Sequence, residues 1–168
     1  MKRIIVAFVA MMLSAAAVSA QNYMVVDSEK VFKSLASYNN ALEQIETLSK
    51  DYQAKVDAKF QEIETIYNNY MKQRASLSES ERQQREQQIL KLEEDATKYQ
   101  ESIFGTEGVI MKRRMELIQP IQKQVFDTIE RFSTQYGYDL VIDISANPTV
   151  LYYSTKVDHT QSIIKELR

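Results

Sequence analysis

The sequence contains no cysteine and only one histidine, His159. The lack of cysteine excludes disulfide bonds, zinc–thiolate sites, thiol nucleophiles and a lipid-anchored N-terminal cysteine. A single histidine excludes His-rich metal sites and leaves one candidate for a Ser-His-Asp triad, but no Gly-x-Ser-x-Gly motif accompanies it. Asp139 and Asp143 offer a carboxylate pair, yet carboxylates at the two ends of a short strand more commonly face solvent. We therefore expect no enzyme activity, no cofactor and no metal site.

Turn-forming residues are also scarce, with only three glycines and two prolines in 168 residues. All-β domains and doubly wound α/β folds need many turns, so this composition excludes both. Long helices must dominate the chain.

The first 20 residues have the pattern of a cleaved signal peptide. A basic start, Met1-Lys2-Arg3, precedes an apolar run from Ile4 to Val18, and the small residues Ser19 and Ala20 suit a signal peptidase. We expect cleavage after Ala20, which leaves 148 residues and takes the net charge from −2 to −4, because the segment holds two basic and no acidic residues. An acidic chain is a poor candidate for nucleic-acid binding, and the sequence predicts a secreted protein.

Helical periodicity fills the middle of the chain. No glycine or proline occurs from Val31 to Leu77, and apolar residues recur there at steps of three or four. They are Ile45, Leu48, Tyr52, Val56, Phe60, Ile63, Tyr67 and Tyr70. Ser78 followed by Glu81 forms a capping box, which predicts that a second helix starts there. This second helix should end at Gly137, as a left-handed residue just past its last turn.

Two such helices predict an antiparallel hairpin arm over residues 38–136, with its tip near 76–80. Few apolar residues lie between Ser78 and Glu101, so the arm should protrude and bend rather than form a globular core. Gly105 and Gly108 are either a hinge or weak positions tolerated in a continuous helix. Pro120 lacks an N–H and predicts a kink. These three residues are the candidate hinge.

The ends of the chain predict strands. Tyr23–Val26, Asp139–Ile144 and Val150–Ser154 have strand character, and a last helix is expected from Thr160 to Leu167. Residues 21–37 and 137–168 would then form a small platform into which the hairpin is inserted. So few strands cannot stand alone, so the platform should be completed by further copies of the chain. The predicted fold class is α+β, mostly α.

The two ends carry a family resemblance. The opening Val25-Val26-Asp27 with Val31-Phe32, and the run Tyr138–Asp143, resemble the Skp/OmpH family of periplasmic holdase chaperones of Gram-negative envelopes. The resemblance implies a homotrimer with a central β-barrel-like body, whose helical arms surround a cavity that holds unfolded outer-membrane proteins without ATP. It implies that the trimer core contains Met24, Val26, Leu140, Ile142, Ile144, Leu151 and Tyr153.

Aromatic residues and a methionine on the arm are candidates for contact with unfolded proteins, because they offer large apolar surface and adapt to varied partners. These residues are Tyr52, Tyr67, Tyr70, Met71 and Tyr99. They could instead pack between the two arm helices. Well-known members of the family are basic, whereas this chain is acidic, so no lipopolysaccharide-binding residue is carried over and membrane-surface contact stays open. A structural coiled-coil spacer or adaptor of the envelope is the alternative function.

Overall fold

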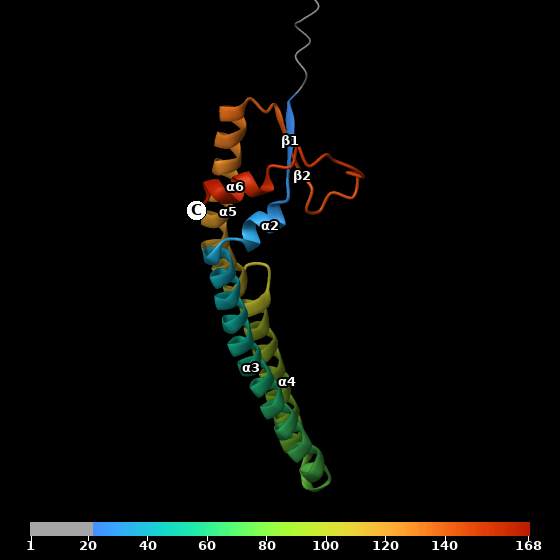
Figure 1. The fold of residues 1–168 in the computed structure, drawn as a ribbon. Coiled ribbons are helices and arrows are strands. Elements are labelled where there is room, and N and C mark those ends of the chain that lie inside the picture. Colours follow the sequence, from blue (N-terminus) through green and yellow to red (C-terminus); the bar gives the residue numbers. More distant parts are fainter. Residues whose placement is uncertain (1–21) are drawn as a thin grey trace, which may run out of the picture. The chain divides into compact units, whose positions relative to one another are not determined.

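The computed structural model describes residues 22–168 (Figure 1), so the predicted signal peptide, residues 1–20, lies outside the described residues. In chain order the elements are β1 (Tyr23–Val26), α2 (Ser28–Lys33), α3 (Ala36–Gln73), the 3-10 turn η2 (Arg74–Ser76), α4 (Glu79–Phe104), α5 (Val109–Tyr136), β2 (Leu140–Asp143) and α6 (Thr160–Glu166). Within residues 22–168 no helix is both long and apolar enough to cross a membrane. The prediction of a mostly helical chain with a long hairpin and a small sheet is confirmed.

The described chain divides into two compact units. The first unit contains residues 22–34 and Val125–Arg168, which include the sheet, α2, α6 and the last part of α5. The second unit is Leu35–Gln124, which contains α3, η2, α4 and the first part of α5. Both chain ends therefore belong to one unit, and the hairpin of α3 and α4 belongs to the other.

The sheet of the first unit joins the two ends of the described chain. β1 pairs with β2 in parallel, with Tyr23 opposite Leu140 and Val26 opposite Asp143. Parallel neighbours need a long crossover connection, and here the crossover is the whole segment from α2 to α5. The prediction that the helices are inserted between two pairing strands is confirmed.

The second edge of β1 is also occupied. The N–H of Val25 donates to the carbonyl of Val157 at 2.8 Å, and the N–H of His159 donates to the carbonyl of Val25 at 3.0 Å. Met24, Val25 and Val26 are consequently buried, each at most 1% exposed. β1 is thus the central strand of the unit, although only four residues long.

A break at Ser34 and Leu35 separates α2 from α3. Leu35 has an extended backbone, with φ −90° and ψ 120°. Before it, the Ser34 hydroxyl donates to the Val31 carbonyl at 2.7 Å, while its N–H also bonds to the last turn. Serine competes in this way for helical backbone groups. Neither glycine nor proline marks the position, so no helix-breaking residue type indicates the break.

In the second unit, α4 starts at the capping box that the sequence predicted. Ser78 caps α4, and the capping box with Glu81 is present in both directions. Side chains in the seam between α3 and α4 recur in heptad steps. The buried members are Val56, Ile63 and Tyr70 on α3, and Ile89, Ala96 and Ile103 on α4.

A break between α4 and α5 replaces the continuous returning helix. The chain leaves the helix at Gly105, and a Cβ on this residue would lie 2.5 Å from the carbonyl oxygen of Glu101. A Cβ on Gly108 would lie 2.4 Å from the carbonyl oxygen of Ile103. Both glycines allow a close approach of backbone that other residues could not make, so they are not merely tolerated positions in an unbroken helix. Hinge motion here stays a prediction.

Pro120 lies inside α5, which continues through it to Tyr136. The predicted kink remains untested. The helix ends with Gly137 at φ +72°, as predicted, and the N–H of Tyr138 donates to the carbonyl of Ser133 at 2.9 Å. This bond is the long bond of a Schellman cap.

The predicted strand Val150–Ser154 is not formed within the described chain. Val150 donates to the carbonyl of Asn147 in a turn, and no ladder of hydrogen bonds follows. Leu151 is 92% exposed and Tyr152 is 86% exposed. The run of apolar and aromatic residues was compatible with a strand, but a strand needs a neighbouring strand and the sheet of the described chain holds only β1 and β2.

Replacing Gly137 with Ala should destabilise the first unit by about 1–2 kcal/mol, the cost of a left-handed conformation in an L-residue. No atom lies within 4 Å of the added Cβ, so the loss would come from the backbone alone. Urea unfolding followed by circular dichroism measures it. Gly137→Asn is the matched control and should lose less, because asparagine tolerates this conformation. Equal stability of wild type and Gly137→Ala would contradict the cap.

Candidate interaction surfaces

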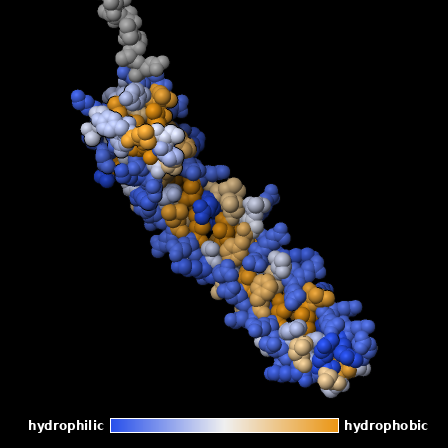
Figure 2. Space-filling view, turned by 90° about the vertical axis from the view of Figure 1, so that its right-hand side faces the viewer, coloured by the Kyte–Doolittle hydropathy of each residue, from blue (hydrophilic) through white to orange (hydrophobic). Residues whose placement is uncertain are grey.

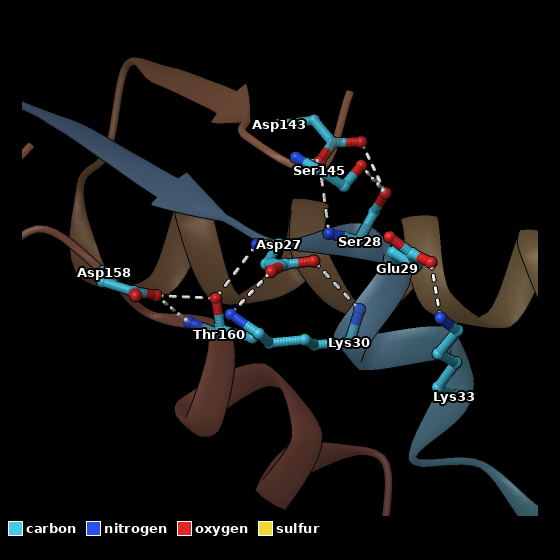
Figure 3. Close-up of polar contacts among 9 residues, drawn as sticks. All are labelled: Asp27, Ser28, Glu29, Lys30, Lys33, Asp143, Ser145, Asp158 and Thr160. Atoms are coloured by element: carbon cyan, nitrogen blue, oxygen red, sulfur yellow. Dashed lines mark hydrogen bonds and ion pairs between the residues drawn. The ribbon is translucent and has the colours of Figure 1, made fainter. Parts of the chain in front are cut away.

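Polar side chains join the start of α2 to the end of β2 (Figure 3). Ser28 donates to Asp143 twice, from its N–H at 3.1 Å and from its hydroxyl at 2.5 Å, and the N–H of Ser145 donates to Asp143 at 3.0 Å. Burial raises the pKa of Asp143, but these hydrogen bonds together lower it by more, so the pKa lies below its ordinary value. A carboxylate held in this way is a structural acceptor, which argues against the acid–base role considered for Asp139 and Asp143.

A second network joins β1 to α6 (Figure 3). The N–H of Asp27 donates to the hydroxyl of Thr160 at 3.0 Å, and that hydroxyl donates to Asp158 at 2.6 Å. Asp27 also caps α2 by accepting the N–H of Lys30 at 3.0 Å. Asp158 also accepts the N–H of Thr160 at 3.0 Å. Thr160 is 3% exposed, and these bonds satisfy it.

His159 lies in an aromatic cluster rather than in solvent. Its Nε2 is 2.8 Å from the hydroxyl of Tyr138, and its ring lies 5.6 Å from that of Phe132. The arrangement packs α6 onto the end of α5. Across residues 22–168 no group of three His, Cys, Asp or Glu side chains could hold a metal ion.

The residues expected in the oligomer core fall into two sets. Met24 and Val26 are buried within the single chain, and Ile142 and Ile144 are half-buried. Leu140 (56% exposed), Leu151 and Tyr153 face solvent. We call this outer set, together with the exposed Tyr152, the assembly face.

The arm residues also differ in exposure. Tyr70 is buried in the seam, where its hydroxyl donates to Glu86 and the carboxylate raises the pKa of the phenol. Tyr52 and Tyr99 are half-buried, and each ring has a lysine ammonium 5.0 Å from its centroid. Tyr67 and Met71 are nearly half exposed.

The sequence missed two members of this exposed set. Phe60, expected in the seam, is 38% exposed, and Leu90 on α4 is 63% exposed. The spacing could not reveal the exposure of Phe60, because it alternates with Val56 and Ile63 at the steps of four and three that are typical of a seam. Which of these two rows faces α4 is seen only in the structure. Figure 2 shows hydrophobic atoms emerging between polar ones at several places along the surface.

The exposed set lines two recesses beside the seam. One, of about 450 Å³, is lined by Tyr67, Tyr70, Met71, Arg74, Glu86, Ile89, Leu90 and Glu93. The other, of about 400 Å³, is lined by Phe60, Ile63, Glu64, Tyr67, Glu93 and Thr97. Tyr67 and Glu93 line both, so the recesses are neighbours, and we call them together the tip groove.

Comparison with known proteins gives consistent matches over nearly the whole described chain. Residues 22–167 match the family described as outer membrane protein (OmpH-like). The chain is 24% identical to "Chaperone protein Skp" of Yersinia enterocolitica, covering 92% of this chain and 91% of that protein. It is 25% identical to "Chaperone protein Skp" of Photorhabdus laumondii, covering 95% and 93%. This family is not one of enzymes, as the sequence predicted.

Asp143→Ala should lower the melting temperature at pH 7 by a few degrees, because a partly exposed carboxylate with several hydrogen bonds contributes about 1 kcal/mol. A carboxyl whose pKa is depressed by folding stabilises the fold above its unfolded pKa of about 3.9, and this contribution is lost as pH falls through the folded pKa. The deficit should therefore shrink below about pH 4.

Asp139→Ala is the matched control, since Asp139 accepts only a long bond of 3.4 Å from the N–H of Asn22. It should change the melting temperature less. A deficit of Asp143→Ala that is the same at pH 7 and pH 3 would contradict the role given to this carboxylate.

Proposed function

The chain belongs to the OmpH-like outer membrane protein family, and we propose that it is a periplasmic holdase chaperone that acts without ATP. In this role it binds unfolded outer-membrane proteins and prevents their aggregation. The two relatives described above are named chaperones, which supports the proposal. The predicted signal peptide, cleaved after Ala20, would deliver the chain to the periplasm.

The observation that carries the proposal is the apolar surface left exposed on the hairpin. Tyr67, Met71 and Leu90 are between 46% and 63% exposed although they lie on helices whose seam is already filled. Such side chains add little to the stability of the hairpin itself. They are suited to loose contact with apolar segments, because tyrosine and methionine offer large and adaptable surfaces.

A holdase needs many weak contacts rather than one deep pocket. Each contact between a client segment and an exposed side chain is replaceable, and several contacts made at once give high apparent affinity. Tyr52 and Tyr99 would add contacts further from the tip. Release then needs no nucleotide, since a client that begins to fold withdraws its apolar segments one at a time.

Assembly into a trimer would complete the first unit. In the described chain β2 pairs on one edge only, and the assembly face exposes Leu140, Leu151 and Tyr153 beside it. An open strand edge next to apolar side chains is a site for pairing with another chain. We propose that residues 150–154 pair as a strand with a neighbouring copy, which would bury the assembly face around the core begun by Met24 and Val26.

Client proteins would lie in the cavity between the hairpins of the three chains, and bending at Gly105 and Gly108 would fit this cavity to clients of different size. Pro120 is a second candidate for such bending. The alternative of a structural spacer is less well supported, because a spacer gains nothing from exposed Phe60 and Leu90. The names of the relatives do not favour it either.

Shortening the hairpin tests the proposal. Lys59 and Tyr99 lie side by side, with the ammonium 5.0 Å from the ring centroid, so a short Gly-Ser turn can replace residues 60–98. The shortened chain should keep the number of subunits of the wild-type assembly but lose protection of a urea-diluted outer-membrane β-barrel, measured by light scattering. Undiminished protection would contradict client binding by the hairpin, and loss of assembly would place the oligomer contacts there instead.

A further inference from the structure

We propose that the tip groove selects unfolded segments in which a large apolar residue is flanked by lysine or arginine. This inference rests on the proposed function and gives it a chemical preference. The site is the margin of the seam on which Phe60, Tyr67, Met71 and Leu90 lie exposed and which Glu64 and Glu93 border. Its occupant is a cationic, apolar stretch of a client chain.

The spacing of the lining residues places them along two neighbouring helix faces. Phe60, Glu64, Tyr67 and Met71 follow one another on α3 at steps of four, three and four, which keeps them on one face. Leu90, Glu93 and Thr97 do the same on α4. The groove therefore runs along the hairpin, which suits an extended segment better than a compact ligand.

Buried side chains form the floor of this groove. Ile63, Tyr70, Ile89 and Ala96 make one apolar cluster, and none of them is more than 7% exposed. Since this cluster closes the seam, the exposed residues at its margin are not needed to fill it. Two open recesses of about 450 and 400 Å³ that share Tyr67 and Glu93 can each receive a side chain of the same bound segment.

The charges that border the groove set the preference. Arg74 is the one cationic side chain in its lining, and it faces Glu86 at 3.9 Å, which also accepts from Tyr70. Within residues 22–168, Glu64 and Glu93 form no ion pair. The unpaired charge of the groove is therefore negative. An acidic segment or an anionic lipid headgroup would be repelled, whereas a lysine or arginine beside the inserted apolar residue would be attracted.

A charge reversal with a matched control tests the inference. The test variant is Glu64→Lys/Glu93→Lys. The control, Glu62→Lys/Asp95→Lys, changes the net charge by the same amount on the same two helices, but Glu62 and Asp95 line neither recess. Two labelled unstructured peptides are the probes, one built on Phe-Lys pairs in a Gly-Ser-Asn background and the other with Glu in place of Lys. Binding is measured by fluorescence anisotropy at low salt, where exposed charges act most strongly.

Wild type and the control should bind the Phe-Lys peptide about fivefold or more tightly than the Phe-Glu peptide, as two exposed ion pairs would give. The test variant should lose or invert this preference. Equal preference in all three proteins would overturn the inference, and so would binding of neither peptide by wild type. If the preference for the Phe-Lys peptide fell equally in the test and control variants, net charge would be its cause. That result would overturn the groove as the source of the preference.

The aggregation assay separates this inference from the proposed function. If wild type protects an unfolded β-barrel and the peptides show no groove-dependent preference, the holdase stands and the inference fails. If wild type protects no client, the proposed function fails. The charge-reversed variant should assemble like the wild type. A smaller assembly of the variant would mean that a second copy of the chain occupies the groove, which would also overturn the inference.

Discussion

The parallel pairing of β1 with β2 is the constraint on which the rest of the structure depends. It brings residues that are more than a hundred positions apart into register, with Val26 opposite Asp143. Because parallel strands need a crossover connection, the chain must leave the sheet after β1 and return to it before β2. The long hairpin satisfies this requirement, and the hydrogen bonds of Asp143 to Ser28 and of Thr160 to Asp27 secure the junction that the pairing creates.

The small size of the sheet explains why we assign assembly to the first unit and client binding to the hairpin. The sheet and the short helices bury three of the four residues of β1 but leave Leu140 and Leu151 exposed, so the first unit has an uncovered apolar surface. The hairpin is unfinished in another way, since its seam uses only one narrow row of side chains. Apolar residues beside that row are available to other chains. The exposed apolar surface of the first unit suits assembly, and that of the hairpin suits client binding. Both surfaces remain because the core is too thin to cover all apolar residues of the chain.

Local signals in the sequence predicted much of this fold. Ser78 with Glu81, and Gly137 after the last turn of α5, mark helix ends through bonds made within a few residues, and both appear as expected. The strands β1 and β2 were also predicted, because short runs of apolar and β-branched residues indicate strands without knowledge of their partners. The break at Ser34 and Leu35 was missed, since it depends on one hydroxyl bonding back to the helix rather than on a residue type that breaks helices.

The candidate surfaces were predictable in part. The apolar stripe identified Tyr67 and Tyr70 together but could not tell that one is exposed and the other buried, because that depends on which heptad row faces α4. Leu90 stood outside the stripe and was not considered. The strand expected at Val150–Ser154 illustrates the opposite limit: its pattern fits a strand, but it pairs with neither strand of the described chain.

Native mass spectrometry of the chain lacking residues 1–20 tests the central claim most directly, alone and after mixing with a urea-diluted outer-membrane β-barrel protein. The account predicts the mass of a trimer, and the mass of that trimer with one client after mixing. A monomer or dimer would contradict the assembly that the exposed face of the first unit implies. A trimer that takes up no client would contradict the holdase.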